Sequence, residues 1–433
     1  MNIAIVGYGL EGQAAYNYYK DKGTITICDV NHVDVPEGTY LQSGPNYLAD
    51  LSRFDVIVRS PAVKPNALVE ASGRDILEKV TSNTNEFIKV SPTRNIIGVT
   101  GTKGKGTTST LITKIIEKLG KRVFLGGNIG LPALDLLKEG IKQEDWVVLE
   151  LSSYQLIDAN ISPHIGVCLM IEPEHLDWHA DIDEYYNAKT NLFRHQNSDD
   201  IAIYYALSEG SRRIASTSKG FKLPYMDKPG AIIKDDNFVI GNEIICSVTD
   251  LKLLGKHNWQ NVAAAITASW QVERNPLAFK EAITGFSGLP YRLEFRGEKD
   301  NVRYYDDSFS SAPPAALAAI EAIPGKKVLI LGGYERNLPL EDFANGIKQN
   351  LDNIRQLLLI GQSAQRLARV LDSVGVKLYT VSEDKIMEEI VNKARQFTKP
   401  GDAVVLSPGF ASFDMFTNFI DRGNKFNQAV DKL

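Results

Sequence analysis

The chain has 433 residues, enough for two or three domains of about 100–200 residues each, and its 43% hydrophobic and 23% charged fractions are those of an ordinary globular protein. Its 48 basic and 53 acidic residues give a net charge of −5, which argues against a nucleic-acid binder because such proteins need a basic surface. The chain lacks a signal-peptide pattern and an apolar run long enough to span a bilayer, so we expect a cytoplasmic protein without a membrane partner.

Short apolar runs alternate with segments of helical periodicity along most of the chain. Continuous apolar strands followed by helices are typical of parallel sheets with helices on both faces, so the predicted fold class is α/β. The predicted strands cover Asn2–Val6, Ile25–Cys28, Val56–Val58, Ile96–Val99, Trp146–Leu151, Ile165–Ile171, Val328–Leu331, Leu357–Ile360 and Ala403–Leu406.

Breaks in this alternation divide the chain into three predicted domains, residues 1–91, 92–289 and 290–433. A Ser-Pro step precedes the second domain, and a Leu-Pro step opens a separate series of strands and helices that forms the third. Within the middle domain, turn residues between short strands predict a small antiparallel β insert over residues 230–248.

The first predicted strand is followed by Gly-Tyr-Gly-Leu-Glu-Gly, and the second is followed by Asp29. This spacing is typical of Rossmann-like domains that bind a dinucleotide, although the motif has low specificity. Taken alone it would favour a nicotinamide-dependent dehydrogenase, an interpretation that leaves the glycine-rich loop of the middle domain without a role. Bound NAD or hydride transfer would support that alternative, and phosphate release stimulated by an amino acid would exclude it.

Residues 95–111 read NIIGVTGTKGKGTTSTL, which predicts a strand, a loop rich in Gly and Thr, and the start of a helix. This arrangement binds phosphates because glycines let backbone N–H groups approach an anion and the helix dipole adds partial positive charge. Lys105 is the predicted point charge for the β- and γ-phosphates. The usual P-loop pattern is broken at Val99 and at Gly106, which stands where Ser or Thr normally follows the lysine. A P-loop switch protein is a further alternative, and it would turn over nucleotide without an acceptor amino acid.

Further polar residues follow the predicted strands of the middle domain. Glu150 ends a buried strand facing the phosphate loop, where a carboxylate suits magnesium. His175 and His179 follow the next strand, and one of them is expected to be structural. Lys189 lies in a predicted helix, where a lysine judged by itself is a solvated charge.

Eight segments, in order along almost the whole chain, resemble segments of the Mur ligase superfamily. They are TGTKGKGTT at 100–108, GGNIGLPALDLL at 126–137, LELSSYQL at 149–156, EHLDWH at 174–179, YYNAKTNLF at 185–193, GKHNWQN at 255–261, GLPYRLEF at 288–295 and LSPGFASFDMFTNFIDRGNKF at 406–426. The segments at 126–137 and 406–426 are most similar to the D-glutamate-adding branch of that family. Two alternatives are a Mur ligase that adds a different amino acid and a folylpolyglutamate-type ligase, of which the latter is not expected to carry these two segments.

The resemblance implies a ligase that forms a carbon–nitrogen bond while converting ATP to ADP and phosphate. In the implied reaction, ATP phosphorylates the terminal carboxylate of UDP-N-acetylmuramoyl-L-alanine, and the amine of D-glutamate then attacks the acyl phosphate, a step in peptidoglycan precursor synthesis. The N-terminal domain is implied to bind the UDP portion, the P-loop ATPase-like middle domain ATP, and the Rossmann-like C-terminal domain the amino acid. Two Mg²⁺ ions are implied, together with a carbamylated Lys189 that supplies oxygen ligands. We expect a monomer.

The resemblance also assigns roles to individual residues. The implied catalytic residues are Lys105, Glu150, His175 and Lys189. The implied metal ligands are Thr107, Glu150, His175 and Lys189. The implied ATP contacts are Thr102, Lys103, Gly104, Lys105, Gly106, Thr107, Thr108, Asn258, Asn261, Arg292 and Asp307. The implied contacts to the UDP precursor and to the amino acid are Leu10, Asp29, Ser60, Asn128, Ser152, Gln155, Ser311, Arg336, Ser412 and Phe419.

Several positions differ from the residues usual in the family, including Val30-Asn31 where Thr-Arg is common and Ser311 where threonine is frequent. Glu11 stands where threonine is common, and its charge would repel a nearby pyrophosphate. Phe309 replaces a lysine, which removes a cation from the expected amino-acid and phosphate contacts. Gly106 cannot supply the hydroxyl that normally binds Mg²⁺. Either Gly106 is an inserted residue that bulges the loop, so that Thr107 becomes the ligand, or water takes the vacant position, and we favour the insertion because a bulge suits glycine.

Overall fold

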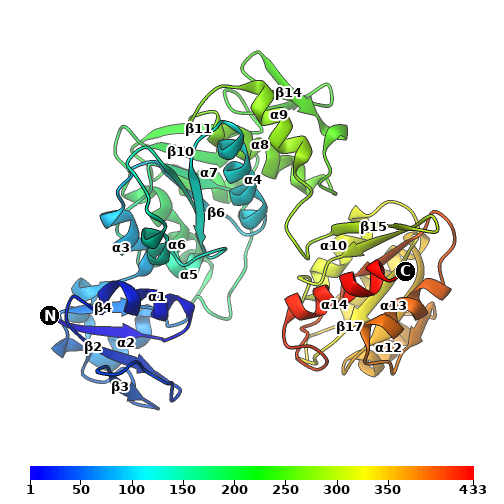
Figure 1. Ribbon diagram of the computed structural model, residues 1–433, viewed down its shortest axis with the longest axis horizontal. Helices are drawn as coiled ribbons and strands as arrows, with labels where there is room; N and C mark the ends of the chain where they lie inside the picture. The colour runs from blue at the N-terminus through cyan, green and yellow to red at the C-terminus, as the bar shows by residue number, and fades with distance from the viewer. The chain divides into compact units, whose positions relative to one another are not determined.

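The computed structural model describes residues 1–433, which form two compact units (Figure 1). Unit 1 contains Met1–Asp250 and Trp259–Gly285, and unit 2 contains Leu251–Asn258 and Phe286–Leu433. Unit 1 holds three sheets and unit 2 holds one. Parallel strands alternate with helices in both units, so the predicted α/β class is confirmed.

The first sheet of unit 1 is parallel throughout, with strand order β3-β2-β1-β4-β5 (Figure 1, blue). Its strands are β1 (Asn2–Val6), β2 (Thr24–Asp29), β3 (Tyr40–Ser43), β4 (Val56–Arg59) and β5 (Val80–Thr81). Its helices are α1 (Leu10–Tyr19), η1 (Leu51–Arg53), α2 (Pro65–Ser72), η2 (Arg74–Lys79) and α3 (Asn83–Val90). Apolar clusters cover both faces, as expected for a Rossmann-like sheet. The strand order reverses between β1 and β4, and ligands of such sheets bind at the carboxyl ends of the strands there.

The second sheet of unit 1 is also parallel, with order β11-β10-β9-β6-β8-β7. Its strands are β6 (Ile96–Thr100), β7 (Val123–Gly127), β8 (Trp146–Glu150), β9 (Ile165–Cys168), β10 (Ile201–Tyr205) and β11 (Phe221–Tyr225). The associated helices are α4 (Lys105–Lys118), η3 (Ala133–Glu139), α5 (Ser153–Leu156), α6 (Ile182–Arg194), α7 (Glu209–Ala215), α8 (His257–Ser269) and α9 (Pro276–Gly285). Every residue of β6 is buried, and β6 lies between β8 and β9. The loops that follow these three strands therefore share one edge of the sheet.

The third sheet of unit 1 is the antiparallel insert that the sequence predicts. It comprises β12 (Ile232–Lys234), β13 (Asn237–Ile240) and β14 (Glu243–Ser247), followed by η4 (Val248–Asp250). The Asp-Asp step between β12 and β13 has positive φ at both residues, the backbone of a tight hairpin turn.

The sheet of unit 2 is mixed, with order β15-β16-β20-β17-β18-β19 (Figure 1, yellow to red). Its strands are β15 (Glu294–Lys299), β16 (Val302–Asp306), β17 (Lys327–Gly332), β18 (Ile354–Ile360), β19 (Tyr379–Val381) and β20 (Ala403–Leu406). Its helices are α10 (Pro313–Ala322), α11 (Glu341–Gln349), η5 (Leu351–Asn353), α12 (Ala364–Ser373), α13 (Met387–Gln396) and α14 (Phe419–Asp431). Apolar cores lie on both faces. The edge pair β15–β16 is antiparallel, whereas the other pairs of this sheet are parallel.

All three cysteines are free and buried. Burial raises the pKa of the Cys28 thiol to about 12 and the pKa values of Cys168 and Cys246 to about 11. A search for membrane spans found no helix with the length and apolar character needed to cross a bilayer.

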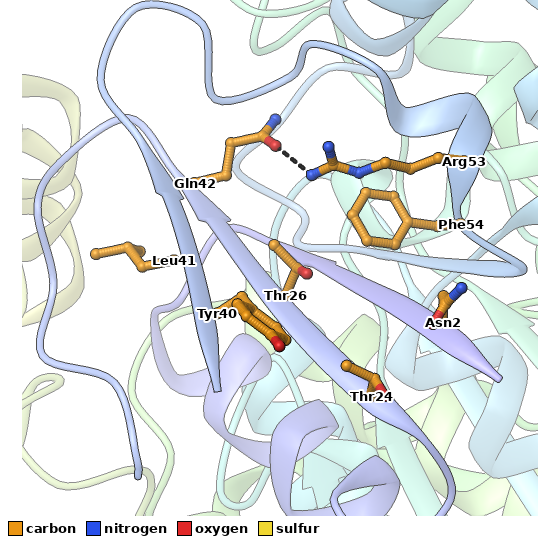
Figure 2. Close-up of a pocket in the computed structure, with 8 residues that line it drawn as sticks. All are labelled: Asn2, Thr24, Thr26, Tyr40, Leu41, Gln42, Arg53 and Phe54. Atoms are coloured by element: carbon orange, nitrogen blue, oxygen red, sulfur yellow. Dashed lines mark hydrogen bonds between the residues drawn. The ribbon is translucent and has the colours of Figure 1, made fainter. Parts of the chain in front are cut away.

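A groove of about 490 Å³ opens on the first sheet of unit 1 (Figure 2). It is lined by Asn2, Thr24, Thr26, Tyr40, Leu41, Gln42, Arg53 and Phe54. Asn2 and Thr24 begin their strands, so the groove reaches the amino end of the sheet, whereas ligands of such sheets bind at the carboxyl end. Across the groove, Arg53 Nη2 donates to Gln42 Oε1 at 2.7 Å. The groove is therefore separate from the predicted site residues.

Candidate active site

The predicted phosphate loop connects β6 to α4, and α4 begins at Lys105. The loop contains two glycines with positive φ, 157° at Gly101 and 86° at Gly104. A Cβ atom on Gly104 would lie 2.2 Å from Asn261 Oδ1, so the loop backbone packs closely against the side chain of Asn261 on α8. The loop therefore presents backbone N–H groups and a helix N-terminus, the features that bind phosphate, beside the predicted adenine contact Asn261.

Two lysines meet at this loop. Lys105 Nζ donates to the carbonyl oxygens of Gly101 and Thr102, both at 3.0 Å. Lys189 Nζ, from α6, donates to the same Gly101 oxygen at 3.1 Å and to Thr100 Oγ1 at 3.2 Å. Two amines that share one carbonyl oxygen repel each other whenever both are protonated.

The expectation that Lys189, judged by itself, is a solvated charge is wrong. The residue is 1% exposed, and burial, assisted by the charge of Lys105, lowers the pKa of Lys189 to about 7. A substantial fraction of this amine is therefore neutral near pH 7, whereas an ordinary lysine is almost wholly protonated. The neutral form is a nucleophile, and it is the form that reacts with CO₂ to give a carbamate.

Glu150 is the last residue of β8 and pairs in register with Val99 of β6, directly before the phosphate loop. Its carboxylate is 5% exposed and accepts a hydrogen bond from Asn128 Nδ2 at 2.8 Å, while its carbonyl accepts the Asn128 N–H at 2.9 Å. The structure thus brings the predicted metal ligand Glu150 and the predicted substrate residue Asn128 together.

The two histidines have different roles. His179 is 2% exposed, and its ring nitrogens lie 2.9 Å from Ser153 Oγ and 3.2 Å from Glu184 Oε2, so this histidine is structural. His175 is more exposed, has a positive φ of 60°, and its ring centroid lies 4.9 Å from that of Tyr154. Burial lowers the pKa of His175, which favours the neutral ring that binds metals.

Magnesium prefers oxygen ligands, so the charges around the predicted metal ligands matter. No three His, Cys, Asp or Glu side chains are close enough to hold a metal ion, and the amines of Lys105 and Lys189 place positive charge beside Glu150. Magnesium is commonly held by one or two carboxylates together with water and substrate phosphates, so Glu150 fits this role, whereas a protonated Lys189 amine beside it opposes a second cation. A carbamate on Lys189 would replace that amine with oxygen ligands. The buried Thr108 hydroxyl on α4 has no hydrogen-bond partner and is a further oxygen near the phosphate loop.

The predicted bulge at Gly106 is absent. Gly106 is the second residue of α4 and does not have positive φ, so the prediction of a bulge at this residue is wrong, whereas the inserted residue itself stays a prediction. Thr107 is the third residue of the helix and is 5% exposed. The helix therefore starts in the ordinary way and lacks a hydroxyl at its second position.

We expect Gly106→Ser to lower the magnesium concentration needed for half-maximal rate by about 2- to 10-fold, because it restores a hydroxyl of the kind that binds Mg²⁺ in P-loops. Serine also suits a helix better than glycine does. The measurement is ATP turnover against magnesium concentration. Thr107→Val is the matched comparison. If it raises the magnesium requirement while Gly106→Ser does not lower it, Thr107 is the ligand.

Several predicted contacts have internal partners. The hydroxyl of Thr102 bonds to the backbone of Glu172 and shares a hydrogen bond with the Tyr185 hydroxyl at 2.9 Å. Lys103 is exposed and lies 4.0 Å from a Glu172 oxygen. The Thr102 hydroxyl is therefore engaged within the protein, whereas the Lys103 side chain is exposed.

The predicted contacts to the UDP precursor lie at the carboxyl ends of β1, β2 and β4. A Cβ atom on Gly7 would lie 2.8 Å from Ser60 Cβ, which brings the first and third of these loops together. Asp29 accepts the N–H groups of Tyr8 at 2.7 Å and Asn31 at 2.9 Å, so this carboxylate orders the loops. Leu10 is exposed as the first residue of α1.

Gln155 and Ser152 form a capping box at the start of α5. Gln155 Oε1 accepts the Ser152 N–H at 3.0 Å, and Gln155 Nε2 donates to Glu11 Oε1 at 2.9 Å. Burial raises the pKa of Glu11, and the hydrogen bond from Gln155 opposes this shift.

The predicted amino-acid residues lie together in unit 2, on loops after β16, β17 and β20 and at the start of α14. Arg336 Nη2 donates to the Ser311 carbonyl at 2.6 Å, and Ser308 Oγ donates to the Phe419 carbonyl at 2.8 Å. Ser412 is buried and follows β20. This cluster provides one guanidinium, hydroxyls and an aromatic ring.

Phe309 and Arg292 join the same cluster. The rings of Phe309 and Phe419 pack edge to face at 5.2 Å, and the Arg292 guanidinium lies 4.5 Å from the Phe309 ring. Asp307 accepts from the hydroxyls of Ser310 and Ser407, and burial raises the pKa of Asp307 to about 6. The expected ATP contacts Arg292 and Asp307 thus belong to unit 2.

The other expected ATP contact in unit 2 is Asn258, whose Nδ2 donates to the Leu254 carbonyl at 2.7 Å. Sequence reasoning missed Thr100 and Tyr185, which contact Lys189 directly. Tyr185 is four residues before Lys189 on α6, so helical spacing could have found it.

Comparisons with known proteins point to one family. The model of the Mur ligase middle domain matches residues 99–269, and that of the Mur ligase glutamate ligase domain matches residues 291–410. A Clostridium botulinum (strain Alaska E43 / Type E3) protein named UDP-N-acetylmuramoylalanine--D-glutamate ligase is 34% identical over 440 residues, covering 100% of this chain and 94% of the relative. A Clostridium kluyveri protein of the same name is 35% identical over 448 residues, covering 100% and 96%.

Solved structures share the fold at low sequence identity. One is MurF ligase from Thermotoga maritima in complex with ADP, with a TM-score of 0.61 and 16% identity, covering 100% of this chain and 95% of that chain. Another is UDP-N-acetylmuramoylalanyl-D-glutamyl-2,6-diaminopimelate--D-alanyl-D-alanyl ligase from Acinetobacter baumannii, with a TM-score of 0.63 and 14% identity, covering 99% and 93%. These likenesses concern the α/β fold alone.

Proposed function

The chain belongs to the Mur ligase family, and on that premise we propose that it is an ATP-dependent ligase joining D-glutamate to UDP-N-acetylmuramoyl-L-alanine in peptidoglycan precursor synthesis. The observation that carries the proposal is the meeting of Lys105, Lys189 and Glu150 at one phosphate loop. A loop that only binds a nucleotide does not require a second, wholly buried lysine with a lowered pKa.

The reaction proceeds in two steps. A carboxylate oxygen of the precursor bonds to the γ-phosphorus of ATP as the bond to ADP breaks. The neutral amine of glutamate then attacks the acyl carbon, the carbon–oxygen bond to phosphate breaks, and the amine loses its proton. Lys105 and the loop N–H groups stabilise the negative charge that develops on the transferred phosphoryl group. Exclusion of water protects the acyl phosphate from hydrolysis.

Glu150, His175 and a carbamylated Lys189 are the residues that would hold magnesium. When bound, magnesium supplies positive charge that neutralises phosphate oxygens. Asn128 fixes the direction of the Glu150 carboxylate through its 2.8 Å hydrogen bond, so its contribution in this proposal is to orient a ligand.

Each part of the chain has a separate task in this proposal. Residues 1–91 bind the UDP portion through loops that carry Leu10, Asp29 and Ser60. Residues 92–289 bind ATP at the phosphate loop, and residues 290–433 bind the amino acid. Arg336 pairs with a carboxylate of D-glutamate, because a guanidinium can bind a carboxylate with two parallel hydrogen bonds. The proposed enzyme is a cytoplasmic monomer.

The test measures phosphate release from ATP with UDP-N-acetylmuramoyl-L-alanine and a panel of D- and L-amino acids. We expect release only when the precursor and D-glutamate are both present, with the glutamyl product seen by mass spectrometry. If another amino acid stimulates phosphate release instead, that amino acid and not D-glutamate is the substrate. Turnover that needs no amino acid would indicate a nucleotide switch, and stimulation by a folate with glutamate would indicate a folylpolyglutamate-type ligase.

A further inference from the structure

Arg59 is the last residue of β4 and is 1% exposed. A guanidinium has five N–H donors, and here all five have acceptors. Nε and Nη2 donate to the two carboxylate oxygens of Asp158 at 2.5 and 2.7 Å, and Nη2 also donates to the Tyr154 carbonyl at 2.9 Å. Nη1 donates to the carbonyls of Ser60 at 3.0 Å and Val63 at 2.7 Å. The side chain is therefore held in one geometry.

These acceptors belong to two segments far apart in the sequence. Ser60 and Val63 form the turn after β4, whereas Tyr154 and Asp158 lie in and just after α5, which follows β8. Arg59 therefore joins the carboxyl edge of the first sheet to that of the second. Asn85 adds a neighbouring link, because its Nδ2 donates to the Asp158 carbonyl at 3.1 Å.

Both segments carry residues of the candidate site. Ser60 is a proposed contact to the UDP portion of the precursor. The other segment begins beside Glu150, and its Tyr154 ring lies 4.9 Å from the His175 ring. The link through Arg59 therefore runs from the nucleotide end of the proposed substrate to the end that is phosphorylated.

Fold stability alone does not account for this arrangement. Apolar residues of similar size often replace a buried ion pair without loss of stability, because desolvation offsets most of the attraction between the charges. An apolar side chain has no directional contacts. The five hydrogen bonds of Arg59 have fixed geometry, and they therefore define the position of one segment relative to the other.

We propose that Arg59 is a positioning residue that sets the spacing between the UDP-binding loops and the phosphorylation site, so that one precursor molecule reaches both. This inference rests on the proposed function. It predicts that losing Arg59 harms only ligands long enough to contact both segments. UDP alone occupies the first sheet and does not depend on the spacing.

The test compares the binding of UDP and of UDP-N-acetylmuramoyl-L-alanine to the full-length protein and to Arg59→Met by calorimetry. We expect the Kd of UDP to change less than about 2-fold and the Kd of the precursor to rise about 10-fold or more, with kcat falling by up to about 100-fold, as is usual when a reacting group is misplaced by about 1 Å. The KM for ATP should not change, because the phosphate loop makes no contact with Arg59.

Asp158→Asn is the second variant, and it keeps the shape of the partner while removing its charge. Asp158→Asn should also raise the Kd of the precursor and lower kcat, by smaller factors than Arg59→Met. It can be tested even if Arg59→Met does not fold. Arg355→Met in unit 2 is the matched control, because Arg355 is also bound to both oxygens of an aspartate, Asp402, at 2.8 and 3.1 Å. This control should leave both affinities unchanged.

Two outcomes would overturn the inference. Equal weakening of UDP and precursor would show that Arg59 only shapes its own loop. A lower melting temperature with both affinities intact would show a purely structural role. If the unaltered protein binds UDP but neither binds the precursor nor releases phosphate with it, the proposed function fails, and this result is distinguishable because it does not involve the variants.

Discussion

Replacing Lys105 with alanine is expected to reduce kcat for precursor-dependent ATP turnover by about 10²–10³, the usual cost of losing a preorganised charge contact to a transition state. Lys105 Nζ donates hydrogen bonds to the carbonyl oxygens of Gly101 and Thr102. It therefore lies at the N-terminus of α4, where the phosphates of ATP would bind. The assay is steady-state phosphate release at saturating ATP.

Lys114→Ala is the control for this prediction. Lys114 lies on the same helix but is exposed and paired with Glu117 at 2.8 Å, so its loss should leave kcat within about 2-fold, as is usual for surface ion pairs. Melting curves should be alike for both variants. Near-normal kcat in Lys105→Ala would contradict the assignment of this lysine to phosphoryl transfer.

Lys189→Ala is the second large effect, and we expect at least about a 10²-fold loss of kcat because an oxygen-ligand position is removed. If the active form of Lys189 is a carbamate, the shortened side chain leaves space that a small carboxylic acid can enter. Acetate or propionate should then restore part of the activity. Lys189→Arg fills the same space and cannot form this carbamate, so it should be inactive and should not respond to added acid.

The pKa of Lys189, lowered to about 7, gives this prediction a pH dependence. The amine loses its proton as the pH rises through about 7, so CO₂-dependent activation of CO₂-depleted enzyme should be faster at pH 8 than at pH 6. Carbon-13 NMR with labelled bicarbonate would detect the carbamate directly. Full activity of Lys189→Ala without added acid would show that the lysine has no part in catalysis.

The strand pattern of the sequence predicts most of the fold because buried parallel strands are continuous apolar runs. β15 was not predicted, since Glu294–Lys299 contains charged residues and only its position at a sheet edge makes it a strand. β9 was predicted to extend to Ile171. The strand ends at Cys168 because the chain turns there toward the phosphate loop.

The candidate site shows where sequence reasoning stops. Glu150 was found because a strand end is visible in the sequence, and its place beside the loop follows from strand pairing. The burial of Lys189 was not visible, because it depends on how α6 packs against β6. The bulge at Gly106 was predicted from residue types alone, whereas the structure has an ordinary helix start at this residue. Two partners of Arg59, Tyr154 and Asp158, are 95 and 99 positions away in the sequence, and no local pattern connects them to it.

The burial of Cys28, Cys168 and Cys246 has a practical consequence. With raised pKa values and little exposure, none of these sulfur atoms should react readily with maleimide dyes near neutral pH. The natural sequence is therefore already a suitable background for site-specific fluorophores. One cysteine introduced on the surface of each unit would accept a donor and an acceptor dye without prior removal of native residues. Energy transfer between the dyes could then follow unit 1 and unit 2 during turnover.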